Sequence, residues 1–263
     1  MSSTIDISTL GMIAAYALLL IPLAMLLWQG VSIVSRVGIA VVRMTVQLLF
    51  VGLYLQFVFN LDNAWLNCAW LLIMILVADV SILRHCRLRV RCFGQPLFVA
   101  LVMGTAIPVL YFTMLILHRP HILEARYLIP IGGMILGNCL RADIIGIRHF
   151  YDTIKRDHRT FELTLAQGAQ LHEAIRPYLR EAFHNAVSPT IATMMTIGLV
   201  SLPGMMTGVI LGGQPPVTAI KYQVAIMIAV FTGTAIAVPC AILMSLKRGF
   251  SPSGPLRRDV FAD

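Results

Sequence analysis

The sequence predicts an all-α protein that crosses a membrane about seven times, and composition is the first reason. Of the 263 residues, 58% are hydrophobic and only 12% are charged, and the mean hydropathy is +0.83. Water-soluble domains are usually about half apolar at most. We therefore expect an integral membrane protein with a single transmembrane domain over residues 1–263 and no sizeable water-soluble domain beside it.

The second reason is the length of the apolar segments, because a bilayer-spanning helix needs about 20 mainly apolar residues. Seven segments qualify, at residues 10–28, 43–59, 64–83, 97–117, 127–147, 187–211 and 218–246. The first has no basic region before it and is as long as a true span. It is therefore expected to be a retained anchor rather than a cleaved signal peptide.

The third reason is the distribution of Lys and Arg, which are retained in excess in cytoplasmic loops. Most of them fall in segments 36–43, 84–91, 141–180 and 247–258, whereas Arg119 and Arg126 lie on the opposite side. This pattern predicts an amino terminus outside and a carboxyl terminus inside. Topology then accounts for the net charge of +8, and no nucleic-acid partner is needed to explain it.

Two segments outside the spans have distinct expectations. Residues 31–42 form either a short amphipathic helix on the inner membrane surface or an inward extension of the second span. The tail at about residues 249–263, which contains Pro252, Gly254 and Pro255, is predicted to be disordered.

The longest segment between spans, residues 148–186, predicts two helices joined by a corner. Phe161, Leu165 and Ala169 recur every four residues and so share one helix face, and Gly168 then ends that helix. A compact corner between helices that continue into the membrane can transmit a rigid-body movement from a docked partner. The alternative is a solvated amphipathic hairpin without a partner.

The sixth predicted span contains a break. Pro203 must free a carbonyl about one turn earlier and kink or unwind the span, and Ser201 and Thr207 are placed to bind that backbone. Irregular backbone at membrane depth occurs only where protein shields it or where it lines a cavity. The glycines that recur every four residues after the break are Gly204, Gly208 and Gly212. They favour close helix packing, whereas the break itself, at residues 203–206, indicates a role in gating or in lining a pathway.

Three motifs carry a resemblance to a known family. They are Gly198-Leu-Val-Ser-Leu-Pro-Gly-Met-Met-Thr-Gly208, continuing to residue 223, then Ile129-Pro-Ile-Gly-Gly-Met-Ile-Leu-Gly-Asn138, and more weakly Arg43-Met-Thr-Val-Gln-Leu48. Together they cover most of the chain. The sequence resembles the FetB-type permeases, membrane subunits of ABC transporters implicated in iron export, with distant plant relatives linked to aluminium tolerance.

The resemblance implies the permease subunit of an ATP-driven transporter that exports a metal ion such as iron across a bacterial inner membrane. It implies two copies of the chain, surrounding membrane lipids, and a separate cytoplasmic ATP-binding subunit that carries Mg-ATP. None of the 19 glycines precedes a lysine, so the Gly-x-x-x-x-Gly-Lys-[Ser/Thr] phosphate loop is absent from this chain. The chain itself is therefore expected to hold no cofactor.

The resemblance also implies roles for particular residues. The corner is similar to the coupling motif of ABC permeases, which would place ATPase coupling at Glu162, Leu165, Ala166, Gly168 and Ala169. The pathway or gate would include Ser201, Pro203, Gly204, Met205, Met206, Gly208, Gln47 and Asn138. Arg141, Asp143 and the segment Gln214-Pro215-Pro216 depart from what that family is expected to show.

No metal ligands are assigned. Methionines gather near the break, at Met194, Met195, Met205, Met206 and Met227. Thioether sulfur suits soft ions, whereas iron prefers carboxylate, imidazole or phenolate ligands, and flexible packing is the commoner role of methionine. His85, Cys86 and Cys92 lack a zinc-type spacing and a fourth ligand.

Few ionisable residues enter the predicted spans, and such residues are functional candidates by default. Asp79 lies about one turn from Arg84, which predicts a structural ion pair near the inner interface. Arg43 and Gln47, four residues apart, share one helix face and are expected to face the protein interior.

Two other classes of protein compete with a transporter subunit. The first is an autonomous seven-helix protein without an ATPase, such as a retinal photoreceptor, a carrier or a channel. Lys221 lies near the outer end of its span, whereas a buried retinal needs its lysine near mid-membrane. The second is a membrane enzyme, but the spans contain no histidine pair, paired carboxylates or nucleophile motif. The chain is therefore expected not to be an enzyme.

Overall fold

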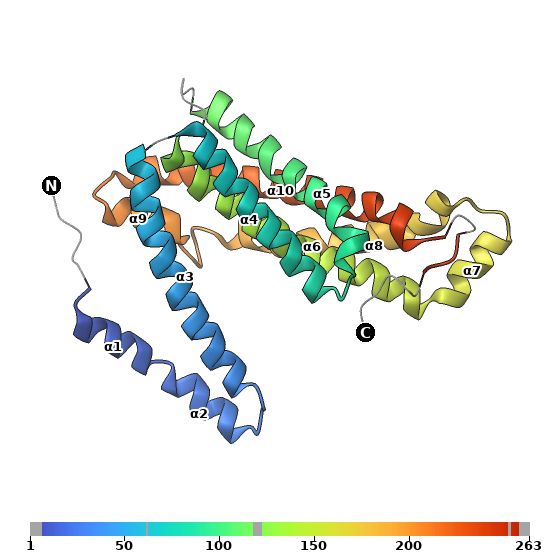
Figure 1. Cartoon of the computed structure of the whole chain (residues 1–263), viewed down its shortest axis with the longest axis horizontal. Helices are drawn as coiled ribbons and strands as arrows, with labels where there is room; N and C mark the ends of the chain where they lie inside the picture. Colours follow the sequence, from blue (N-terminus) through green and yellow to red (C-terminus); the bar gives the residue numbers. More distant parts are fainter. Residues whose placement is uncertain (1–6, 62, 118–122, 252–253, 258–263) are drawn as a thin grey trace.

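The computed structural model describes residues 7–61, 63–117, 123–251 and 254–257, and within them it forms helices and no β-strand. The helices are α1 (Thr9–Ala17), α2 (Leu20–Trp28), α3 (Val34–Leu61), α4 (Ala64–His85), α5 (Val90–Tyr111) with a π-helical end η1 (Phe112–Ile116), α6 (Ala125–Arg156), α7 (His158–Ala166), α8 (Leu171–Thr196), α9 (Gly204–Leu211) and α10 (Pro216–Gly249) (Figure 1). The all-α prediction is confirmed for these residues.

Six stretches of the described chain are long and apolar enough to cross a membrane. They are Thr9–Trp28, Val34–Phe59, Ala64–His85, Val90–Ile116, Ala125–Arg156 and Pro216–Gly249. The predicted integral membrane protein is therefore confirmed, but the count of seven spans is not. The predicted span at residues 187–211 is not one helix, because α8 ends at Thr196 and α9 begins only at Gly204.

Helices α4, α5, α6, α8 and α10 form the body of the molecule, and α10 packs along both α5 and α6. Glycines allow the closest approach between α5 and α10. A Cβ atom at Gly233 would lie 2.6 Å from the backbone oxygen of Gly104, so neither helix has room for a side chain there. Large buried side chains such as Phe93, Leu97 and Ile135 fill the rest of this core.

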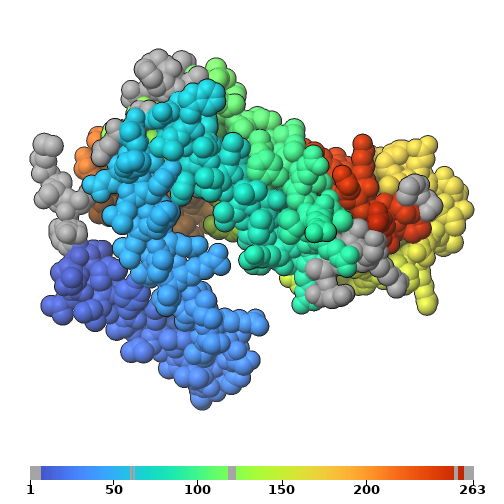
Figure 2. Space-filling model, in the orientation of Figure 1, coloured from blue at the N-terminus to red at the C-terminus, as the bar shows by residue number. Residues whose placement is uncertain are grey.

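Helices α1, α2 and α3 form an arm that stands away from the body (Figures 1 and 2). Among the described side chains of the α1–α3 arm, only Val58 is buried. The arm meets the body at the end of α3, where Tyr54 stacks on Trp70 and Val58 packs against Ala125 and Ile129. Helix α3 runs unbroken from Val34, so most of segment 31–42 extends the second span rather than forming a separate surface helix.

The predicted disorder of the tail after Gly249 is not tested by the structure, but some residues there pack against the body. Helix α10 continues to Gly249, and the ring of Phe250 is buried, with its centroid 5.7 Å from that of Phe161 and 6.4 Å from that of Phe150. Gly254 lies so close to Leu165 that a Cβ there would come within 2.9 Å of its Cδ1. An aromatic side chain thus packs the first residue beyond α10 against the body; residues 252–253 and 258–263 lie outside the described residues.

Candidate functional site

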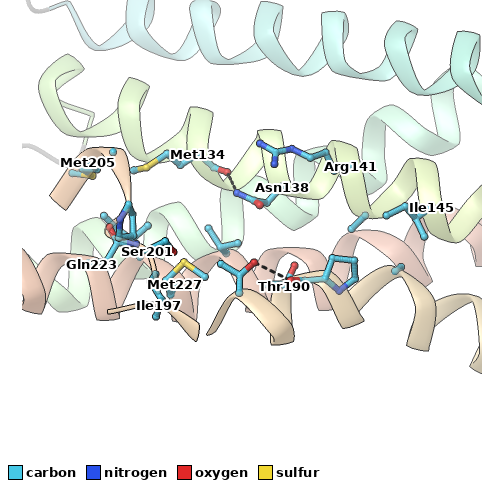
Figure 3. Close-up of a pocket in the computed structure, with 18 residues that line it drawn as sticks. Met134, Asn138, Arg141, Ile145, Thr190, Ile197, Ser201, Met205, Gln223 and Met227 are labelled. Carbon is cyan, nitrogen blue, oxygen red and sulfur yellow. Dashed lines mark hydrogen bonds between the residues drawn. The ribbon is translucent and has the colours of Figure 1, made fainter. Parts of the chain in front are cut away.

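A cavity of about 510 Å³ lies between α6, α8, the break before α9, and α10 (Figure 3). Its wall on α6 includes Met134, Asn138 and Arg141, spaced so that they share one face of that helix. Thr190 and Thr193 of α8 line it as well. The cavity therefore lies at membrane depth between three long helices, two of which are membrane-spanning by length and composition.

The cavity wall mixes apolar and polar side chains and contains no acid. Gln223 of α10 is only 8% exposed, and its Oε1 atom has no hydrogen-bond partner. The Asn138 side chain donates from Nδ2 to the backbone oxygen of Met134 at 2.8 Å, and the Arg141 guanidinium is exposed beside it. Amide, hydroxyl and guanidinium groups of this kind suit a ligand that carries oxygen atoms or negative charge.

A tight resident metal ion does not fit this donor set. Iron prefers carboxylate, imidazole or phenolate ligands, and none of these groups lines the cavity. Across the described residues, no group of three or more His, Cys, Asp or Glu side chains is arranged to hold a metal ion. The soft donors in the cavity wall are the thioethers of Met134, Met205 and Met227.

The break at residues 197–203 begins where the backbone of Ile197, the C-cap of α8, becomes extended. Gly198 follows with a φ of +87°, a left-handed conformation that glycine adopts without strain. Its backbone N–H donates to the backbone oxygen of Ser201 at 2.9 Å, and Pro203 is the N-cap of α9. The Thr207 hydroxyl donates to the backbone oxygen of Pro203 at 3.1 Å. The predicted interruption near Pro203 is thus present, as a complete break rather than a kink.

The structure brings together five of the residues predicted for the pathway, and three others lie elsewhere. Those that line the cavity are Asn138, Ser201, Pro203, Gly204 and Met205. Met206 and Gly208 belong to α9 but not to the cavity wall, and Gln47 is exposed on the α1–α3 arm. A Cβ at Gly204 or Gly208 would meet nothing within 4 Å, so these glycines mediate no helix contact within the chain.

Sequence reasoning did not find Gln223, Thr190 and Thr193. A single polar residue inside an apolar helix is weak evidence for a site. Whether it faces a cavity is known only when the positions of the neighbouring helices are known. Gln223, a polar residue inside the last predicted span, was the strongest available sign. Arg141 was noted for its departure from the expected family pattern, and the structure places it in the cavity wall.

The predicted corner is present as helix α7 and the turn that follows it. Gly168 has a φ of +95°, and α8 begins at Leu171 after a capping box in which the Gln170 N–H donates to Glu173 Oε2 at 2.8 Å. Glu162, Ala166 and Gly168 are exposed, whereas Leu165 and Ala169 are half-buried. The corner therefore presents a small outer surface while Leu165 turns toward the protein.

Packing holds the corner firmly against the body. Phe161 of α7 is 2% exposed and makes an edge-on contact with Tyr178 of α8, with centroids 6.0 Å apart. Burial, and after it the nearby Asp157 charge, raise the pKa of the Tyr178 phenol, which stays neutral. Beside the corner, α8 carries a shallow groove of about 600 Å³ lined by charged side chains that include Arg176, Arg180 and Glu181.

Two buried carboxyl groups lie in the body, away from the cavity wall. The predicted ion pair between Asp79 and Arg84 is not formed: Asp79 is 4% exposed and lies against α5 at Gly94, whereas Arg84 is exposed. Asp143 is fully buried, and neither of its carboxyl oxygens has a hydrogen-bond partner. The expectation failed because Asp79 and Arg84 lie on different sides of α4, one toward the bundle and one away from it.

This combination of spans, an interrupted helix and a polar cavity at membrane depth defines a polytopic helical membrane protein built around a site between its helices. The chain belongs to the uncharacterised protein family UPF0014, whose model matches residues 9–250. The family recognised from the glycine-rich motifs is thereby confirmed.

Three similar proteins show the range of the family. The UPF0014 membrane protein slr1647 of Synechocystis is 35% identical over 84% of this chain and 86% of that protein. The protein ALUMINUM SENSITIVE 3 of Arabidopsis thaliana is 30% identical over 94% of this chain and 90% of its own length. The protein named "Probable iron export permease protein FetB" of Escherichia coli is 28% identical over 90% of this chain and 91% of that protein. No solved structure matches the chain.

Proposed function

We propose that this chain is the membrane-spanning permease subunit of an ATP-driven transporter that exports a metal ion such as iron. A membrane permease role agrees with the family and with the printed name of the Escherichia coli relative. The ATPase, the two-copy assembly, the substrate and the bacterial inner membrane are parts of the proposal. So are the orientation, with the amino terminus outside, and the absence of a catalytic role for this chain.

The observation that carries the proposal is the corner around Gly168. Helix α6 continues without interruption from the cavity wall at Asn138 to Arg156, and α7 follows it after Asp157, with buried Phe161 packed against Tyr178 of α8 and Phe250. Force applied to α7 is therefore passed to the cavity by one continuous helix. A separate ATP-binding subunit that docks on the exposed side of α7, at Glu162 and Ala166, would use this connection to change access to the cavity.

The cavity suits weak and reversible binding of the transported ion. Amides, hydroxyls and thioethers bind a metal ion weakly compared with carboxylates, and a transported ion must leave as readily as it enters. The exposed Arg141 favours an ion that arrives with anionic ligands over a bare cation. We therefore propose a complexed or partly hydrated metal ion as the transported species.

Co-purification tests the class of transporter. The tagged chain is extracted gently from native membranes, its companions are identified, and Mg-ATP hydrolysis is measured with and without added iron. A stoichiometric ATP-binding subunit whose activity rises with iron is the expected result. A chain that purifies alone from several mild detergents, and that transports iron by itself in liposomes, would instead identify an autonomous carrier or channel.

Two substitutions at one position locate the docking surface. Ala166→Arg places a long charged side chain on the exposed side of α7, and Ala166→Ser is the matched control with a small side chain. The first is expected to reduce recovery of the ATPase by at least about tenfold, which corresponds to about 1.4 kcal/mol. The control should retain it. Equal recovery with both variants would place the docking surface elsewhere.

A further inference from the structure

Among the described residues, most of α3 is exposed and stands away from the body (Figure 1). Its contact with the body lies near the end of the helix, where Tyr54 stacks on Trp70 and where Leu55 and Val58 pack in one cluster with Ala125 and Ile129. Helices α1 and α2 lie along another side of α3, where the Tyr16 hydroxyl is 2.7 Å from Thr45 Oγ1. Figure 2 shows open space between the arm and the body away from the point where they meet.

The uncovered face of α3 carries polar side chains. At about 100° per residue, Arg43, Gln47, Tyr54 and Val58 fall within about 60° of one another around the helix. Because Tyr54 and Val58 contact the body, Arg43 and Gln47 are turned toward the open space, and both are exposed. Gln47 lies near the middle of a membrane-spanning helix, where polar side chains normally face protein or a water-filled cavity rather than lipid.

The cavity between α6, α8 and α10 is uncovered at a matching position. It is open on one side, and a Cβ at Gly137, next to its polar wall, would meet nothing within 4 Å. Asn138 lies nine residues from Ile129 along α6, and Gln47 lies eleven residues from Val58 along α3. At about 1.5 Å per residue, the two positions are about 13.5 and about 16.5 Å along their helices from the contact that Ile129 and Val58 share.

The arm of the same chain cannot cover this cavity. Helix α3 touches α6 at Ala125 and Ile129, which lie on one side of α6. Met134, Asn138 and Arg141, which line the cavity, lie about 160–220° further round the helix from Ala125. A helix face with two polar side chains at membrane depth and an open, partly polar cavity at a similar depth thus lie on opposite sides of one chain.

We infer that a second copy of this chain covers the cavity with its α3, so that Gln47 of the partner subunit faces Asn138. In a two-fold pair the exchange is reciprocal, and each arm covers the other cavity. The two amide side chains then have hydrogen-bond partners at a depth where lipid offers none. The inference rests on the two-copy assembly of the proposed function and adds which surfaces meet and which residue the second copy contributes to the site.

Photo-crosslinking tests this arrangement. A benzophenone amino acid replaces Gln47 in one tagged copy, which is co-expressed with a copy that carries a different tag and irradiated in native membranes. The links are then mapped by mass spectrometry. The matched control carries the same probe at Leu49, which is 65% exposed and lies about 200° further round α3. Native mass spectrometry of the unirradiated protein in nanodiscs reports separately whether two copies assemble.

We expect a product of doubled mass that joins the two tags, with links from position 47 to residues 134–145 of the other copy. Its yield from position 47 should be at least fivefold higher than that from position 49. Links from position 47 to residues 134–145 within one copy would overturn the exchange. Lipid adducts in equal amounts from both positions would overturn it as well. Two assembled copies without the expected link would reject this arrangement and leave the proposed transporter standing, whereas a single copy in native mass spectrometry would count against both.

Discussion

Gly233 of α10 lies against Gly104 of α5 so closely that a Cβ on Gly233 would be 2.6 Å from the Gly104 backbone oxygen and 2.8 Å from Ile135 Cγ2. Neither glycine belongs to the motifs that the sequence made conspicuous. The conspicuous stripe at Gly204 and Gly208 instead faces open space. Glycine spacing alone therefore does not distinguish a contact within the chain from a surface left open.

Gly233→Ala is expected to destabilise the protein. The added methyl group must displace backbone or a β-branched side chain in a packed core, which costs about 1–3 kcal/mol. Thermal unfolding in mild detergent measures the change. Gly208→Ala is the control, and it should change the stability by less than about 0.5 kcal/mol because the position is open. Equal effects of the two substitutions would show that the α5–α10 contact is not as close as described.

Gly168→Val is expected to uncouple ATP hydrolysis from transport while the protein still inserts in the membrane. The position has a φ of +95° and open space around it, so the strain comes from the backbone and not from crowding. A left-handed non-glycine residue costs about 1–2 kcal/mol, which is enough to shift the turn but not to unfold the bundle. Transport and hydrolysis are measured together in liposomes. Normal coupled transport by this variant would refute the docking role of the corner.

Phe250→Ala is expected to loosen α7. Its ring is 4% exposed and packs against Phe161 and Phe150, and removal of a buried phenylalanine ring costs about 3–5 kcal/mol when the surroundings do not collapse. Limited proteolysis should then cut the region around residues 158–170 faster than in the parent protein. Leu163→Ala is the control on the same helix, because Leu163 is 59% exposed. Unchanged cleavage in Phe250→Ala would mean that α7 is held by α8 alone.

Asp143→Asn is expected to raise the stability or leave it unchanged. The carboxyl group is fully buried and neither oxygen has a partner, so the amide keeps the shape and removes a group whose charged form is costly to bury. Thermal unfolding is measured for this variant and for Asp152→Asn, which alters an exposed residue whose Oδ2 is 3.5 Å from Arg148 Nε. A loss of more than about 1 kcal/mol in Asp143→Asn alone would show that the carboxyl group binds a partner.

The sequence by itself determined the helical class, the membrane setting, most span positions and the two places where helices must stop. The hydrophobicity and length of a segment depend only on residues that are neighbours in sequence. They locate the spans because lipid offers the backbone no hydrogen-bond partners, so a spanning segment must satisfy its own backbone groups as a helix. Pro203 and Gly168 act through their own backbone conformations, so the break and the corner were visible without any tertiary contact. The same reasoning did not foresee that Phe250, just beyond the last span, is buried against Phe161 and Phe150.

Only the tertiary structure decided which polar residues share a site. Asp79 lies toward the bundle and away from Arg84. Gln223 and Thr190 line the same cavity as Asn138, whereas Gln47 lies outside it on the α1–α3 arm. These outcomes depend on the rotation of each helix about its axis and on which neighbour it meets. Packing between residues distant in sequence sets both of these, and the apolar content that placed the spans carries no information about either.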